Sequence, residues 1–185
     1  MGAGAWTKNW QSLQNIMLMG SHHTGISTLI GTDGNQIADY TGSASMSSPI
    51  CRLLVSGSFR DYEVNELVLG TGTATPTADD YYITPINGMT ELSSLNYNPT
   101  YDTANGTVSR TYSKTWQYRG TGSVTIAEWG LLTMYVTGIS TYWDYGPTGT
   151  RVMVYRELLD TPITLQAYQS VKLQVTVNLT LAEPQ

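Results

Sequence analysis

The end of the chain constrains the fold most, because residues 171–181 alternate between apolar and polar side chains without a break. The apolar positions are Val171, Leu173, Val175, Val177, Leu179 and Leu181. The positions between them are Lys172, Gln174, Thr176, Asn178 and Thr180. Successive side chains of a strand point to opposite faces of a sheet, so this pattern predicts a strand with one buried and one wet face.

Six earlier segments also have the composition of strands, and clusters of Gly, Pro, Asn and Asp separate them. With the last strand, the predicted set is 50–59, 62–69, 80–86, 107–119, 123–136, 151–158 and 170–181. No helical pattern lies between them, which favours an all-β, antiparallel β-sandwich of the jelly-roll-like or Greek-key type. The intervening segments 87–106 and 138–149 are predicted to be long loops.

One short amphipathic helix is predicted at the start of the chain. Trp6, Trp10, Leu13, Ile16 and Met17 follow helical spacing and share one stripe, with Thr7 as N-cap and Gly20 after the last turn. This stripe has to dock either on the chain's own sheet or on a neighbouring subunit. A stretch rich in Gly, Ser and Thr follows the helix, so we divide the chain into an N-terminal helix and arm, 1–49, and a sandwich domain, 50–185.

Charge and composition exclude several classes of function. The chain has 9 Lys and Arg against 14 Asp and Glu, a net charge of −5, which does not suit binding to a phosphate backbone. A single cysteine, Cys51, excludes an internal disulfide and a cysteine-based zinc site. No apolar run approaches the ~20 residues that span a bilayer, and the start lacks the pattern of a secretory signal. We therefore expect no nucleic-acid partner, no membrane segment and synthesis in the cytoplasm of the host cell.

Residues suited to catalysis are scarce. His22 and His23 are the only histidines, and the nearby acids Asp33 and Asp39 are the only obvious partners for them. No Gly-x-Ser-x-Gly turn is present, and a loop rich in Gly and Ser offers no rigid frame for a base. We therefore expect no catalytic activity, no cofactor and no metal. Calcium bound by the acidic pair that ends the Gly-Thr-Gly-Thr loop, residues 79 and 80, stays open as an alternative.

Three segments in fixed order stand out. They are ELVLGTGTATPTADD at 66–80, VTIAEWGLL at 124–132, and RVMVYRE at 151–157 followed by TPITL at 161–165. This arrangement resembles structural proteins of tailed bacteriophage virions, notably tail-fibre and tail-associated proteins. These have a GTGT loop ending in an acid, an I-x-E-x-G-L strand, an R…PIT segment and a terminal strand. The resemblance implies a virion protein. Trp129 and the Tyr-rich 138–149 segment depart from the family pattern.

The second segment also has a physical interpretation of its own. Glu128 lies in an apolar strand, and a buried carboxylate is tolerated only when it is paired or hydrogen-bonded. Arg151 or Arg156 on a neighbouring strand is the expected partner. Gly130 would permit a bulge or a close approach of another chain segment. We expect these four residues to form a structural lock, unless Glu128 instead lies at a solvated edge.

The functional expectation is a structural virion component that binds copies of itself and other virion proteins at the tail, neck or fibre attachment site. A capsid decoration protein is the nearest alternative. A glycan-binding module that recognises the host surface is an alternative of another class, in which Tyr142, Trp143 and Tyr145 would stack on sugars. The expected interface residues are Trp6, Trp10, Leu13, Met17, Tyr142, Trp143 and Tyr145.

Overall fold

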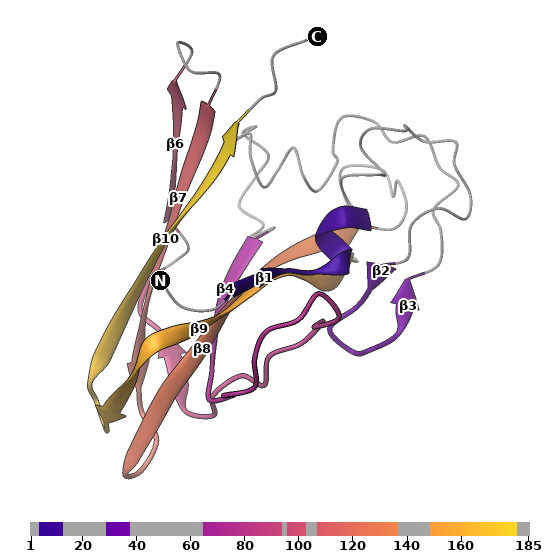
Figure 1. The fold of residues 1–185 in the computed structure, drawn as a ribbon. Helices are drawn as coiled ribbons and strands as arrows, with labels where there is room; N and C mark the ends of the chain where they lie inside the picture. The colour runs from indigo at the N-terminus through magenta and orange to yellow at the C-terminus, as the bar shows by residue number, and fades with distance from the viewer. Residues whose placement is uncertain are drawn as a thin grey trace, which may run out of the picture.

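The computed structural model describes residues 4–12, 29–37, 65–93, 96–102, 107–136 and 149–180. Within these ranges the chain is all-β, and its strands pair antiparallel in two larger sheets and one small one (Figure 1). The predicted all-β class is therefore confirmed. None of the helices in the described ranges is long and apolar enough to cross a bilayer.

The first sheet has the strand order β1-β9-β8-β4. Its strands are β1 (Gly4–Trp6), β9 (Gly149–Gln166), β8 (Ser123–Val136) and β4 (Asn65–Gly70). The β8–β9 ladder is long and shifts register twice, between Ile126 and Glu128 and between Leu131 and Leu132. Such bulges re-aim side chains, and the two shifts flank the part of β8 that carries Glu128 and Gly130.

The second sheet centres on β7 (Thr107–Tyr118). Strand β10 (Ser170–Thr180) pairs with one edge of β7, while β5 (Met89–Glu91) and β6 (Asn96–Asp102) share its other edge. Strands β2 (Leu29–Ile30) and β3 (Gln36–Ile37) form a separate small sheet, joined by a turn in which Gly34 has a φ of 80°.

Three described connections cross between the two large sheets: residues 71–88 lead from β4 to β5, and the other two are adjacent turns. Residues 119–122 join β7 to β8, and residues 167–169 join β9 to β10. The amide of Ala167 donates to the carbonyl of Gly122 (3.1 Å) and the amide of Tyr168 to that of Tyr118 (2.6 Å). The sheets meet at these turns and diverge from them toward the other end of the molecule (Figure 1).

Both large sheets contribute to one hydrophobic core. It holds Tyr112 and Trp116 from β7 together with Leu131 from β8 and Val152 from β9, all of them buried. On β7 the even-numbered residues from 110 to 118 are buried and the odd-numbered ones from 109 to 117 are half-exposed, as the period of two requires. The buried face of β7 thus carries aromatic residues together with Arg110 and Lys114.

Most predicted strands lie where the sequence placed them, including β8 at 123–136. Segment 80–86 does not form a strand, because only an isolated bridge between Gly70 and Pro85 occurs there. Part of the predicted loop 87–106 forms β5 and β6, and the predicted strand 151–158 continues to residue 166. The predicted strand 50–59 and loop 138–149 lie outside the described residues, apart from Gly149 at the start of β9.

The predicted N-terminal helix is wrong for residues 4–6, which form β1 and pair with β9. A helical turn covers 8–12, and residues 13–20 lie outside the described ranges. Thr7 directly precedes this turn, at the predicted N-cap position, and its hydroxyl donates to the carbonyl of Met153 (2.6 Å). Residues 4–12 are therefore joined to the sheet of the unit that we placed at 50–185.

Candidate functional site

A buried ion cluster, made of Asp80, Glu128 and Arg156, lies on the first sheet. Glu128 comes from β8 and Arg156 from β9, and their exposed fractions are 3% and 7%. In the ladder Arg156 lies opposite Gly130 and Glu128 opposite Leu158, so the two charged residues are diagonal neighbours. Diagonal pairs are within reach of long side chains, and the strand register alone brings these charges together.

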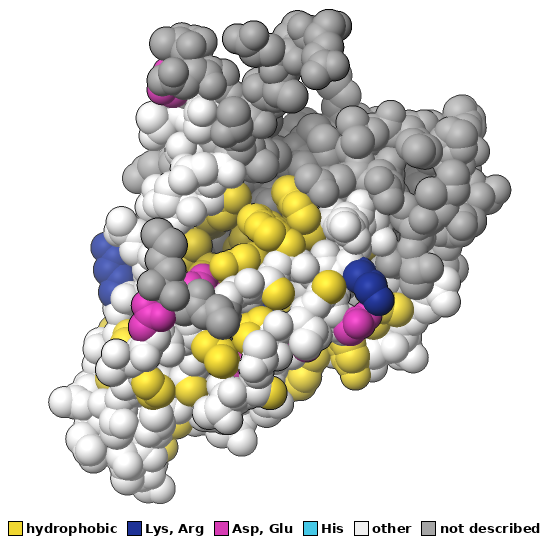
Figure 2. Space-filling view, viewed as in Figure 1, with side chains coloured by type: hydrophobic (Ala, Val, Ile, Leu, Met, Phe, Trp, Pro, Cys, Tyr) yellow, Lys and Arg dark blue, Asp and Glu magenta, His cyan; other side chains and the backbone are white. Residues whose placement is uncertain are grey.

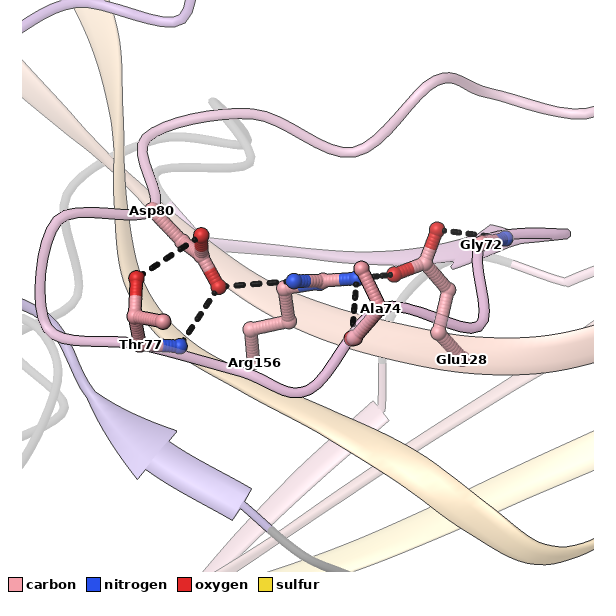
Figure 3. A network of polar contacts seen from close by, with 6 residues as sticks. All are labelled: Gly72, Ala74, Thr77, Asp80, Glu128 and Arg156. Carbon is pink, nitrogen blue, oxygen red and sulfur yellow. Dashed lines mark hydrogen bonds and ion pairs between the residues drawn. The ribbon is translucent and has the colours of Figure 1, made fainter.

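The Arg156 guanidinium uses all three of its nitrogens inside the chain (Figure 3). Its Nε and Nη2 lie 2.7 and 2.6 Å from Oε2 of Glu128. Its Nη1 donates to Oδ2 of Asp80 (2.7 Å), and Nη2 also donates to the carbonyl of Ala74 (3.1 Å). Oε1 of Glu128 accepts the amide of Gly72 (2.8 Å). The cluster therefore binds the 71–80 loop to the sheet at three places along the loop.

Asp80 is in turn held by the loop itself. Its carboxylate accepts the amide of Thr77 (2.9 Å) and pairs with the Thr77 hydroxyl (3.1 Å). The adjacent Asp79 forms an ion pair with Lys8 (2.5 Å), whose amide donates to the carbonyl of Ala78 (2.7 Å). Both carboxylates that sequence analysis considered as calcium ligands thus contact protein cations. Among the described residues, no group of three His, Cys, Asp or Glu side chains could hold a metal ion.

The electrostatic balance within the cluster favours the ionised forms of Asp80 and Arg156. Burial pushes the pKa of Asp80 upward, but hydrogen bonds from Arg156 and Thr77 and the charge of Arg156 outweigh burial, so the pKa falls below 3.8. For Arg156, burial alone would lower the pKa, and contacts with Asp80 and Glu128 raise it above its ordinary value. Two carboxylates around one guanidinium leave the cluster with one net negative charge.

Glycines make room for this arrangement. A Cβ on Gly130 would lie 2.7 Å from Cδ1 of Ile83 and 3.2 Å from the carbonyl oxygen of Tyr155. A Cβ on Gly70 or Gly72 would collide with the side chain of Glu128. The glycines of the GTG motif are therefore needed where the loop crosses the carboxylate, and Gly130 is needed where Ile83 packs on β8.

Of the two arginines that the sequence offered to Glu128, Arg156 is the partner. Arg151 pairs instead with Glu66 on β4 (2.6 Å), and its side chain is 53% exposed. Asp80 was not predicted to join the lock, although the resemblance motif included the acid that ends the loop. A further ion pair that the sequence did not suggest joins Lys114, fully buried on β7, to Glu91 on β5 (2.6 Å).

The predicted interface residues are only partly described. Trp10 is 7% exposed and belongs to the chain's own core, so it does not present its ring to a second subunit. Trp6 is 40% exposed, stacks on Trp10 with ring centroids 4.7 Å apart, and meets Tyr155 edge-on at 4.9 Å. The remaining candidates lie outside the described residues, namely Leu13, Met17, Tyr142, Trp143 and Tyr145. The same holds for His22, His23, Asp39 and Cys51.

A cavity of about 220 Å³ lies between the two sheets. Its lining includes Glu66 and Arg151 of the first sheet and Glu91 and Trp116 of the second. The charged groups in this lining are engaged with each other or with Lys114. The rest of the lining is mainly apolar and also includes Thr32 and Tyr82.

Comparison with known proteins adds no relative: no family model, curated protein or solved structure matches this chain.

Proposed function

We propose that this protein is a non-enzymatic structural component of a tailed-phage virion, with its two sheets as the layers of a β-sandwich of Greek-key or jelly-roll type. It assembles at the tail, neck or fibre attachment site through contacts with copies of itself and with other virion proteins. The proposal rests on the three-segment resemblance and on how the described residues use their charges.

The observation that supports the proposal most is the use of charge in the described residues. The buried charges pair with one another inside the chain, and exposed strand positions carry neutral polar side chains. The ion cluster ties the 71–80 loop to β8 and β9, and its guanidinium has no nitrogen left over. The 71–80 loop, which belongs to the first segment of the resemblance, is thus fixed to the sheet. A rigid frame suits a subunit that must keep its shape inside a particle.

Exposed strand positions on both large sheets carry neutral hydroxyl side chains. Thr111 of β7 and Thr176 of β10 pair through their hydroxyls (2.9 Å), as do Thr125 of β8 and Thr164 of β9 (3.0 Å). Figure 2 shows a face on which charged side chains are few and scattered and hydrophobic side chains gather near the centre. Neutral surfaces can be buried in permanent contacts without the dehydration of ions, and such contacts depend little on salt.

Deletion of the gene from the phage that encodes it, with complementation from a plasmid, tests this function. The expected result is that deletion yields particles lacking tails or fibres, or no particles, and that the intact gene restores them. Neighbouring genes for a portal, terminase or tail tube are expected as well. Normal, infectious particles in the deletion strain, with a normal set of virion proteins, would contradict the proposal.

A further inference from the structure

Strand β10 is a long sheet edge that no described strand covers. All of its residues, Ser170–Thr180, pair in unbroken register with β7 on one side. Its other side carries no partner within the described ranges, because β10 ends the strand order of its sheet. Every second residue therefore directs its backbone N–H and C=O groups toward this open edge.

The other described edges carry features that oppose pairing, and β10 does not. Strand β6 contains Pro99, and the outer edge of β9 contains Pro162 beside a large irregularity of register. Strands β1 and β4 are short. Proline, bulges and short length are the means by which proteins protect edges against association. Along β10 there is no proline and no bulge, and Lys172 is the only charged residue.

The side chains of β10 fit a continued sheet. Val171, Leu173 and Val175 face the core but are only half-buried, while the residues between them are exposed. An additional strand beside β10 would extend the apolar row and cover these three side chains. The incoming strand must therefore alternate apolar and neutral polar residues in the same way as β10.

We infer that β10 binds the β10 strand of a second copy of this chain, antiparallel and across a two-fold axis, so that two sheets become one. The strand is complementary to itself in this arrangement. With the axis at Val175, Lys172 lies opposite Asn178 of the second copy and Gln174 opposite Thr176, so no like charges meet. Roughly ten backbone hydrogen bonds would form across the new ladder. This inference rests on the proposed assembly function and names one of its contacts.

Amide hydrogen exchange at low and high protein concentration, combined with analytical ultracentrifugation, tests the pairing. In the monomer, only the set of β10 amides that bonds to β7 is expected to be protected. In the dimer, the alternate set should exchange about tenfold more slowly or better. The double variant Gln174→Lys, Asn178→Lys places like charges across the axis and should weaken dimerisation roughly tenfold or more. It should keep protection of the β7-facing set, which shows that the sheet is intact.

A matched control adds the same charge to the edge of another strand, at the exposed positions Thr161→Lys and Gln166→Lys of β9. This variant should dimerise as the unaltered chain does. A monomer at all concentrations, or a dimer in which the alternate β10 amides stay unprotected, would overturn the inference. If that protein is nevertheless abundant in purified particles, the assembly function stands and only the β10 contact fails. If the chain pairs through β10 but is absent from particles, the β10 contact stands and the assembly function fails.

Discussion

Replacing Arg156 by methionine should destabilise the protein more than any other change to the ion cluster. Methionine keeps most of the aliphatic bulk but removes the guanidinium. Glu128, 3% exposed, then keeps only the Gly72 amide and loses its counter-ion. Stranding one partner of a buried pair costs about 3–5 kcal/mol. We expect a loss in that range for Arg156→Met.

The reverse change is milder because the cluster is asymmetric. In Glu128→Ala, Arg156 retains Asp80 and the carbonyl of Ala74, so its charge stays compensated. The cost should be about 1–3 kcal/mol, the range for a buried polar group that loses a partner. The double variant should lose less than the sum of the two single losses, by about 0.5–3 kcal/mol.

Urea unfolding followed by tryptophan fluorescence measures these free energies of unfolding. Arg151→Met is the matched control, because its pair with Glu66 is more than half exposed on the arginine side and is expected to contribute about 0–1 kcal/mol. The reasoning fails if Arg156→Met costs no more than Arg151→Met. It also fails if the losses for Glu128 and Arg156 add fully, since coupling is what the geometry requires.

Three further predictions concern the surroundings of the cluster. In the folded protein the pKa of Asp80 lies below its ordinary value of 3.8. The ionised Asp80 carboxylate therefore stabilises the fold above pH 3.8, and this stabilisation is lost as the pH falls through the pKa of the folded protein. Acid titration of stability should therefore show the unaltered protein converging with Asp80→Asn below pH 3.8. Burial and the hydrogen bond to Glu157 raise the pKa of Tyr155 from 10.0 to about 12. The free energy of unfolding should therefore fall as the pH rises between these two values, and it should fall less in Tyr155→Phe. Unfolding measured at alkaline pH checks this difference. Gly130→Ala should cost about 1–3 kcal/mol through the contact with Ile83, and Ile83→Val, which removes the contacting methyl group, should recover part of the loss in the same urea assay.

Strands with one wet face could be located from sequence alone. Alternation in β10 and in the second half of β7 is nearly complete, and only a strand accommodates it. The extension of β9 beyond residue 158 was missed because Pro162 looks like the end of a strand, whereas the register shift accommodates it. Strand β6 was missed for the related reason that Asn and Pro99 are typical of loops.

The predicted helix shows why spacing can mislead. Trp6 and Trp10 are four residues apart, as on a helical face, and their rings do stack. The stacking joins a strand to a helical turn, and β1 forms because β9 offers an edge to residues 4–6. Pairing with a distant strand outweighed local propensity here, and no local pattern reveals such a partner.

The candidate site was predictable in part. An acid inside an apolar strand requires a partner, and the arginines of the following strand were the natural choice. Which arginine faces Glu128 depends on the register shifts of the β8–β9 ladder, which no sequence pattern specified. Asp80 lies 76 residues from Arg156 along the chain, so its role follows only from how the 71–80 loop folds over the sheet.

Quantitative mass spectrometry of gradient-purified phage particles shows whether this chain is a structural part of the virion. We predict that the chain is present in a fixed, integral ratio to the portal or major tail protein, and that it stays with the particles through repeated washing in high salt. Absence of the chain from particles whose other structural proteins are all detected would contradict the assignment as a virion component.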